Sequence, residues 1–112
     1  MNLFFSGVKT LFIFYEYKID GGLMITHGTS TYVNAEYIGK HCTINQNVTI
    51  CVSKGGKKPI IGNNVTIRIG AIVVGGITIG DNALIAAGSV VIRDVPANCM
   101  VSGNPAVVKK WL

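Results

Sequence analysis

The sequence of 112 residues, with a mass of 11.9 kDa, has room for one domain. Hydrophobic residues make up 49% and charged residues 13%, and this balance excludes a disordered chain, a collagen-like chain and a long solvated helix. The formal net charge of +5 suits an anionic ligand, but the basic residues are scattered and not interleaved with aromatic residues, so we expect no nucleic-acid partner.

Residues 1–18 form an aromatic and apolar segment that differs from the rest of the sequence. Its apolar run, from Leu3 to Tyr17, is shorter than the roughly 20 residues needed to span a bilayer, and Lys9 interrupts it. The segment lacks the basic start and the small-residue cleavage site of a signal peptide. We therefore expect no transmembrane segment, but a short element packed on the end of the domain or on a partner subunit, with a membrane-surface anchor as the alternative.

From residue 19 to residue 98 the sequence repeats every six residues, and one domain is expected over this range. Isoleucine or valine starts nearly every hexad; the starting residues are Ile19, Ile25, Thr31, Ile38, Ile44, Ile50, Ile61, Ile67, Val73, Ile79, Ile85 and Val91. Four positions later the residue is small or apolar, except at Lys54. Because a period of six does not fit the 3.6 residues of a helical turn, and β-branched residues favour strands, we expect both columns to point into the core of a β structure.

The column three positions into each hexad predicts the turns. Nine of its twelve residues are glycine or asparagine, which adopt a left-handed backbone at the lowest cost; the column comprises Gly22, Gly28, Asn34, His41, Asn47, Ser53, Asn64, Gly70, Gly76, Asn82, Gly88 and Asp94. Three short strands and three turns make one triangular coil. The twelve hexads therefore predict four coils, stacked by parallel-strand hydrogen bonds at a spacing of about 4.8 Å, with each apolar row buried against its neighbours.

One loop and one tail depart from the hexad pattern. In the stretch CVSKGGKKPIIG, from Cys51 to Gly62, two hexad starts, Ile50 and Ile61, are separated by eleven positions rather than twelve. A glycine- and lysine-rich loop over residues 52–60 is therefore expected to leave the prism. Residues 99–112 no longer follow the hexad and are expected to form a C-terminal tail.

The hexads IGKHCT, IGNNVT and IGDNAL resemble those of the hexapeptide-repeat acyltransferases. The resemblance implies an all-β fold, a left-handed parallel β-helix of about four triangular coils with a protruding loop and a short N-terminal apolar segment. Three segments are similar to serine acetyltransferase-like members of this family, namely residues 21–39, 51–62 and 86–110. Because a fold alone does not specify a chemistry, the expected activity depends on these segments.

The two histidines occupy different columns of the hexad. His41 stands in the turn column, where histidine tolerates the left-handed backbone, so a structural role accounts for it. His27 stands one position earlier, in an outward column, within the segment that resembles the family's catalytic segment. The resemblance implies that His27 is a general base. A neutral imidazole, with a pKa near 6.5, takes the proton of an acceptor hydroxyl, which then attacks the thioester of acetyl-CoA directly.

The sequence gives less support to covalent catalysis by cysteine and to a zinc site. Three cysteines, an odd number without paired spacing, indicate reduced thiols and a cytoplasmic protein. A covalent route through cysteine is the competitor, but Cys42 falls in the inward column, and no base lies beside Cys51 or Cys99 in the sequence. A γ-type carbonic anhydrase, which shares the β-helix, holds zinc with three histidines where this chain has two, so we expect no metal.

The resemblance also implies the binding residues. For acetyl-CoA it points to backbone groups along the coil edge, and to two lysines that suit either the CoA phosphates or a solvated tail: Ser53, Gly55, Gly70, Ala87, Gly88, Lys109 and Lys110. For the acceptor it points to Thr26, Lys57 and Lys58, with the lysines as point charges for a carboxylate or an anionic sugar. Family members are trimers with active sites between neighbouring prisms, so a homotrimer is expected.

Two departures from the serine acetyltransferase pattern bear on the acceptor. Phe12 stands where the family pairs its base with an aspartate, and Thr26 replaces the acid that precedes the base. These losses favour the smaller relatives that acetylate sugar hydroxyls during capsule or lipopolysaccharide synthesis, while L-serine stays open as the acceptor. The second hypothesis, from another class, is a non-catalytic β-helix scaffold or a truncated remnant, which would show neither turnover nor CoA binding.

Overall fold

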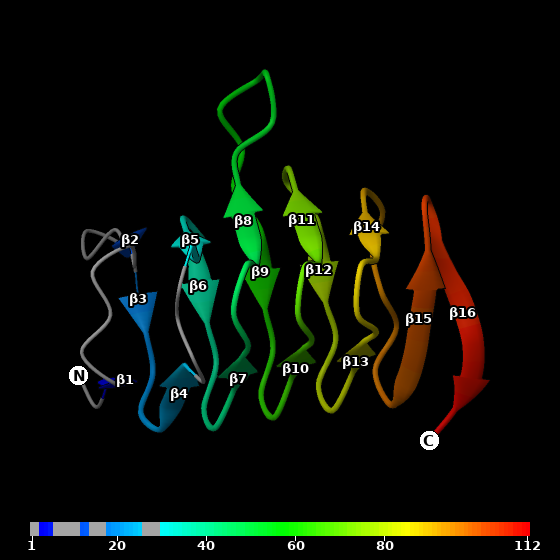
Figure 1. The fold of residues 1–112 in the computed structure, drawn as a ribbon, viewed down its shortest axis with the longest axis horizontal. Helices are drawn as coiled ribbons and strands as arrows, with labels where there is room; N and C mark the ends of the chain where they lie inside the picture. Colours follow the sequence, from blue (N-terminus) through cyan, green and yellow to red (C-terminus); the bar gives the residue numbers. More distant parts are fainter. Residues whose placement is uncertain (1–2, 6–11, 14–17, 26–29) are drawn as a thin grey trace.

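The computed structural model describes residues 3–5, 12–13, 18–25 and 30–112, which form strands and turns arranged as three sheets along one prism (Figure 1). Sheet 1 contains, in spatial order, β1 (Leu3–Phe5), β4 (Leu23–Ile25), β7 (Thr43–Ile44), β10 (Thr66–Ile67), β13 (Leu84–Ile85), β15 (Cys99–Gly103) and β16 (Ala106–Trp111). Sheet 2 contains β2 (Phe12–Ile13), β5 (Tyr32–Val33), β8 (Thr49–Cys51), β11 (Ile72–Val74) and β14 (Val90–Val91). Sheet 3 contains β3 (Lys18–Ile19), β6 (Tyr37–Ile38), β9 (Ile60–Ile61) and β12 (Thr78–Ile79).

Successive strands along the chain enter the three sheets in turn, so a strand pairs with the strand of the same sheet in the next coil; in the coil of β13 and β14, sheet 3 is continued only by a single bridge between Ile79 and Val95. These pairs are parallel throughout; for example, Thr66–Ile67 of β10 pairs with Thr43–Ile44 of β7 and with Leu84–Ile85 of β13. This arrangement confirms the predicted all-β fold, the left-handed parallel β-helix. None of the described residues forms a helix that is long and apolar enough to cross a membrane.

The stack contains more coils than the hexad count predicts. Strands β1, β2 and β3 pair in parallel with β4, β5 and β6, respectively, and so extend all three sheets towards the N-terminus. The expected boundary at residue 18 therefore falls inside a strand, β3, and the described parts of residues 1–18 belong to the coil stack. The physical reason is that the backbone groups at the free edge of β4, β5 and β6 need hydrogen-bond partners, which these strands supply.

The core is a narrow column of isoleucine, valine and small residues along the axis of the prism. The hexad starts from Ile38 to Val91 are at most 1% exposed, as predicted. Among the described residues of the second inward column, Ile77 is the most exposed at 8%, apart from Lys54, which lies in the loop. Burial of one such aliphatic side chain contributes about 1.5–3 kcal/mol to folding, so the repeated column is the main source of stability.

The predicted register is wrong at Thr31. The structure places Val33, not Thr31, at the start of this hexad, because Val33 pairs with Ile50 of the next coil. The chain takes eight positions from Ile25 to Val33, against six from Ile44 to Ile50, so two extra residues fall between β4 and β5. The chain then takes five positions from Val33 to Ile38, which makes the following corner one residue shorter than the hexad.

The three corners of the coil use different backbone conformations. Corner 3/1, from sheet 3 to sheet 1, and corner 1/2, from sheet 1 to sheet 2, carry the predicted left-handed residues Gly22, His41, Asn47, Asn64, Gly70, Asn82 and Gly88. At corner 2/3 the prediction of left-handed backbone is wrong for Asn34, Ser53, Gly76 and Asp94; here Gly75 and Gly56 have positive φ instead. Corner 2/3 is thus the corner at which the hexad varies most, and the loop leaves the prism there. Gly28 of the turn column lies outside the described residues.

Residues 99–112, expected as a tail, form a hairpin. Strand β15 continues sheet 1 in parallel with β13, and β16 folds back antiparallel on β15, with a register shift between Met100 and Val101 (Figure 1). The hairpin forms because Cys99 and Val101 keep the alternating inward pattern and are at most 2% exposed. Strand β16 therefore lies at one end of the described prism.

Candidate functional site

The loop at corner 2/3 projects from the prism between β8 and β9 (Figure 1). It is closed at its base by two backbone hydrogen bonds, in which Ser53 N–H donates to Lys57 O (3.0 Å) and Gly56 N–H donates to Ser53 O (2.9 Å). Gly56 has a φ of 80°, a conformation that costs glycine little. The predicted loop is confirmed, and its base has a defined shape.

The turn of the next coil, Gly75–Gly76, supports the base of the loop. A methyl group in place of the Gly76 hydrogen would lie 2.7 Å from Lys57 Cβ, and one at Gly75 would lie 3.2 Å from Ser53 Cβ. Two glycines are therefore needed where the loop passes closest to this turn. They let the stem of the Lys57 side chain lie directly on the backbone of the neighbouring coil.

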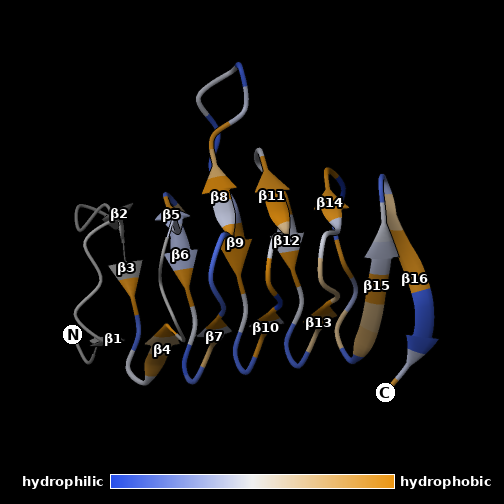
Figure 2. Cartoon of the chain, viewed as in Figure 1, coloured by the Kyte–Doolittle hydropathy of each residue, from blue (hydrophilic) through white to orange (hydrophobic). Residues whose placement is uncertain are grey.

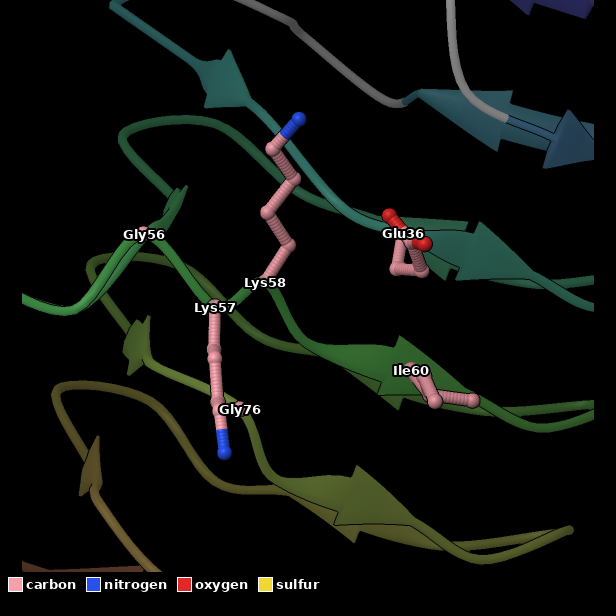
Figure 3. Close-up of a pocket in the computed structure, with 6 residues that line it drawn as sticks. All are labelled: Glu36, Gly56, Lys57, Lys58, Ile60 and Gly76. Carbon is pink, nitrogen blue, oxygen red and sulfur yellow. The ribbon is translucent and has the colours of Figure 1, made fainter.

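A cavity of about 350 Å³ lies beside the loop base. It is lined by Glu36, Gly56, Lys57, Lys58, Ile60 and Gly76 (Figure 3). The two lysine side chains extend in opposite directions from the loop, while Ile60 lies on β9 and Glu36 directly precedes β6 (Figure 3). The cavity therefore combines both signs of charge with one exposed aliphatic side chain, since Ile60 is 42% exposed.

Glu36 is the residue of this cavity that the sequence analysis missed. Its backbone N–H donates to Pro59 O (2.8 Å), which ties the shortened corner between β5 and β6 to the end of the loop. Its side chain is exposed, and among the described residues its carboxylate has no hydrogen bond or ion pair. The available signal was the missing residue between Val33 and Ile38, which turns Glu36 outward beside the lysine loop.

A buried oxygen without a partner lies at the same corner. The Asn34 N–H donates to Ile50 O (2.8 Å), but its side-chain Oδ1 is buried and has no hydrogen-bond partner within the described part of the chain. An unsatisfied buried acceptor costs about 1–3 kcal/mol. Such costs are tolerated most often where function, rather than stability, sets the local structure.

The residues implied for acetyl-CoA at corner 1/2 lie together. Gly70 and Gly88 occupy successive turns with φ of 73° and 71°, and a methyl group on Gly70 would lie 3.9 Å from Gly88 Cα. The Gly88 N–H donates to Ile69 O (2.9 Å), and the space beside Gly88 is open for at least 4 Å. With the exposed Ala87, these turns form a strip of bare backbone that a thin ligand can follow.

The structure does not bring all the implied residues together within one chain. Ser53 and Gly55 lie in the loop at corner 2/3. Gly70 lies at corner 1/2, and the five positions from Gly70 to Gly75 along β11 and its flanks correspond to roughly 16 Å of extended chain between the two corners. Lys109 and Lys110 are exposed on β16, where the second half of the strand is hydrophilic (Figure 2). Lys110 pairs with Met100, at the end of the prism rather than beside Gly88.

His27 and Thr26, implied as the base and as an acceptor residue, lie outside the described residues. The other histidine is placed. His41 has a φ of 57°, its N–H donates to Gly21 O (3.0 Å), and a methyl group on Gly22 would lie 2.6 Å from its Nδ1. His41 thus packs over a glycine turn at corner 3/1, as expected for a structural residue.

The thiols are protonated groups of the fold rather than activated nucleophiles. Burial raises the pKa of the Cys42, Cys51 and Cys99 thiols, and Cys42 donates a hydrogen bond to Gly62 O (3.0 Å). A raised pKa leaves little thiolate at neutral pH, so none of the three resembles an activated nucleophile. Among the described residues, no group of three or more histidine, cysteine, aspartate or glutamate side chains is placed to hold a metal ion.

One phenol on the outer face of sheet 3 is strongly paired. The Tyr37 hydroxyl donates to the carboxylate of Asp20, and this hydrogen bond, followed by desolvation, raises the pKa of Tyr37. Tyr37 pairs in register with Ile60, which lines the cavity. The Asp20–Tyr37 pair therefore orders the sheet surface one strand away from the cavity.

Comparison with known proteins places these features in context. The family model for the bacterial transferase hexapeptide (six repeats) matches residues 58–93. A serine acetyltransferase of Staphylococcus aureus is 40% identical over 119 aligned residues, which cover 98% of this chain and 52% of the relative.

Solved structures that superimpose on this chain are serine acetyltransferases, as are the relatives found by sequence. A serine acetyltransferase of Neisseria gonorrhoeae in complex with serine superimposes with a TM-score of 0.76 at 40% identity, over 84% of this chain and 39% of that one. A serine acetyltransferase of Brucella abortus in complex with coenzyme A gives a TM-score of 0.76 at 34% identity, over 85% of this chain and 39% of that one. This chain spans about half or less of the length of these relatives.

Proposed function

Because this chain belongs to the serine acetyltransferase-like hexapeptide-repeat acyltransferases, we propose that it transfers the acetyl group of acetyl-CoA to the hydroxyl of a small acceptor, L-serine or a sugar. The observation that carries the proposal is the superposition of nearly the whole β-helix on family members solved with serine and with coenzyme A. The charged cavity beside the loop supports a small polar acceptor.

The proposed reaction is a direct transfer with His27 as the general base. The neutral imidazole accepts the proton of the acceptor hydroxyl while the oxygen bonds to the acetyl carbonyl carbon. The carbon–sulfur bond then breaks, and the sulfur takes the proton from the imidazolium, which leaves an acetyl ester and free CoA. The raised pKa of the three thiols favours this route over an acyl-cysteine intermediate.

For acetyl-CoA, we propose that the donor follows the bare backbone strip at Gly70, Ala87 and Gly88. The open space beside Gly88 supports this, because the thin pantetheine arm needs backbone without large side chains. The other residues implied for this role lie on the loop and on β16, so they would serve different parts of the donor or a second chain: Ser53, Gly55, Lys109 and Lys110.

We propose that the active site is completed in a homotrimer. Gly70, Ala87 and Gly88 lie at corner 1/2, whereas Ser53 and Gly55 lie in the loop at corner 2/3, so a single chain keeps these two groups of implied residues apart. The outer side of sheet 2 supports assembly. Val52, Ile72 and Ile92 lie on or directly after three neighbouring strands, each at least 36% exposed, and Figure 2 shows these strands as hydrophobic.

The test is thiol release from acetyl-CoA with a panel of L-serine and sugar acceptors. We expect His27→Ala to lower kcat a hundredfold or more, because removal of a positioned base costs about 10²–10⁴ in rate. His41→Asn is the matched control, since asparagine also accepts the left-handed backbone at this turn, and it should retain activity. Absence of both turnover and CoA binding in the unmodified protein would instead support a scaffold.

A further inference from the structure

The cavity beside the loop presents an opposite charge pair to a ligand rather than a single sign of charge. Its lining residues include one carboxylate, Glu36, and the side chains of Lys57 and Lys58. Among the described residues, neither Glu36 nor Lys57 has an ion-pair or hydrogen-bond partner for its side chain. A neutral sugar would leave both charges without a counter-charge, whereas a ligand with an ammonium and a carboxylate would neutralise both.

The positions of these charges are set by the backbone. The Lys57 stem lies against Gly76, so its ammonium is directed along the neighbouring coil. The Glu36 backbone is hydrogen-bonded to Pro59 O (2.8 Å) at the other side of the loop base. Figure 3 shows Lys57 on the loop base and Glu36 directly before β6, with the two side chains extending in different directions. The charges are thus separated rather than paired with each other, which leaves them available to a ligand.

The remaining lining suits the small carbon skeleton of such a ligand. Ile60 offers an aliphatic surface beside Glu36, and Gly56 and Gly76 leave room that side chains would fill. The volume of about 350 Å³ accommodates a molecule of amino-acid size.

We propose that Glu36 is the specificity-determining residue of the acceptor site, where it binds the ammonium group of a zwitterionic acceptor. This inference rests on the proposed acetyl transfer and deepens it. Lys57 binds the carboxylate of the same acceptor, and Ile60 contacts its carbon chain. Glu36 takes no part in proton transfer; it selects amino-acid acceptors over neutral sugars and places the hydroxyl by holding the opposite end of the molecule.

Three acceptors that differ by one charged group separate the two contacts. L-serine carries both charges, 3-hydroxypropionate lacks the ammonium and ethanolamine lacks the carboxylate, while all three keep the hydroxyl. Glu36→Gln should raise the KM for L-serine and for ethanolamine about tenfold or more, because each loses a charge-assisted hydrogen bond, and should leave the KM for 3-hydroxypropionate unchanged or lower. Glu36→Asp, which keeps the charge, should recover part of the loss for L-serine.

Two lysine variants provide the matched comparison. Lys57→Gln should raise the KM for L-serine and 3-hydroxypropionate but not for ethanolamine. Lys54→Gln removes the same charge from an exposed loop residue that does not line the cavity, and it should change none of the three values. The KM for acetyl-CoA should stay constant in every variant, which a general disturbance of the fold would not allow.

Calorimetric titration of L-serine into the protein without acetyl-CoA separates this inference from the proposed function. Binding that weakens in Glu36→Gln supports the inference even if no turnover is found, and in that case the proposed acetyl transfer fails alone. Turnover of a neutral sugar with no binding of L-serine overturns the inference and leaves acetyl transfer standing. An equal effect of Glu36→Gln on all three acceptors also overturns it, because the residue would then act on the fold rather than on the ammonium group.

Discussion

Three glycines, Gly39, Gly62 and Gly80, lie where the next coil approaches the backbone most closely. A methyl group on Gly62 would overlap with the Asp81 carboxylate oxygen and lie 3.0 Å from the Asp81 backbone nitrogen. That carboxylate accepts a hydrogen bond from Asn63 N–H (2.8 Å) and so caps the corner. The glycine of the hexad is therefore required by the neighbouring coil and not by its own backbone angle.

At the residue scale, we predict that Gly62→Ala destabilises the protein by about 2 kcal/mol, because the Asp81 side chain or the neighbouring strand must shift. Urea unfolding followed by circular dichroism measures this loss. Gly55→Ala is the control. Its nearest neighbour would be Ser53 Oγ at 4.0 Å and its φ is not positive, so the same substitution should leave stability unchanged or slightly higher. Equal effects at both positions would contradict the steric explanation.

At the scale of the elements, corner 3/1 is held by a ladder of asparagine side chains. Asn64 Nδ2 donates to Asn82 Oδ1 (3.2 Å), and Asn82 Nδ2 donates to Asn98 Oδ1 (2.8 Å). All three residues have φ between 57° and 63°, so asparagine serves the backbone and the ladder at once. This explains why the turn column favours asparagine at this corner and glycine at corner 1/2, where a ligand is proposed to pass.

The two roles of Asn82 can be measured separately. Asn82→Gly keeps the left-handed backbone and removes the two ladder bonds, so we expect a loss of about 1 kcal/mol. Asn82→Ala also forces a left-handed backbone on a residue with a Cβ, and should cost about 1 kcal/mol more. Chemical denaturation of both variants gives the difference. If alanine proves no worse than glycine, the backbone conformation is not what selects asparagine here.

At the scale of the whole molecule, stability should vary along the prism. Strands β7 to β11 have a hydrogen-bonded neighbour on each side within their sheets, whereas β14 pairs with β11 alone in the described sheet. In a stack of coils that contact only their neighbours, the last units open most easily. The local stability of a strand therefore depends on its position in the stack as much as on the identity of its buried residue.

We accordingly predict a gradient in amide hydrogen exchange. The amides of Thr49 and Thr66, which donate to Ala71 O and Ala83 O (3.0 Å each), should exchange at least tenfold more slowly than those of β14 and β16. Mass spectrometry or NMR of the exchanging protein measures these rates. Uniform protection from Thr43 to Trp111 would show instead that the coils open as one cooperative unit.

Much of the fold could be predicted from the sequence because its period has a direct physical cause. Isoleucine or valine at six-residue intervals fills the core, and glycine or asparagine allows the turn. The errors occur where this pattern is weak. Strands β1 and β2 lack it, so the extra coil was missed, and the insertion before Tyr32 shifted the register by two residues. The extra coil and the shifted register both depend on which strands pair between neighbouring coils. The sequence of one strand alone does not show its pairing partner.

The candidate site was less predictable. Lys57 and Lys58 were found through the interruption of the hexad, but Glu36 was not, because its place in the cavity depends on the shortened corner after Val33. Gly70, Ala87 and Gly88 follow from the repeat, since equivalent turns stack on one corner. These two groups lie at opposite ends of the sheet 2 strands, and this separation could not be predicted from the sequence until each residue had been assigned to a corner.

The hairpin of β15 and β16 has a consequence for how copies of this protein can join. A parallel β-helix with an open end can accept a further coil from another molecule, and repeated addition would produce a filament. Here the last strand of sheet 1 runs opposite to the others, and it carries the exposed charges of Lys109 and Lys110. An incoming coil could not match this strand and the parallel strand β14 together, so the antiparallel hairpin disfavours the stacking of a further coil on β16.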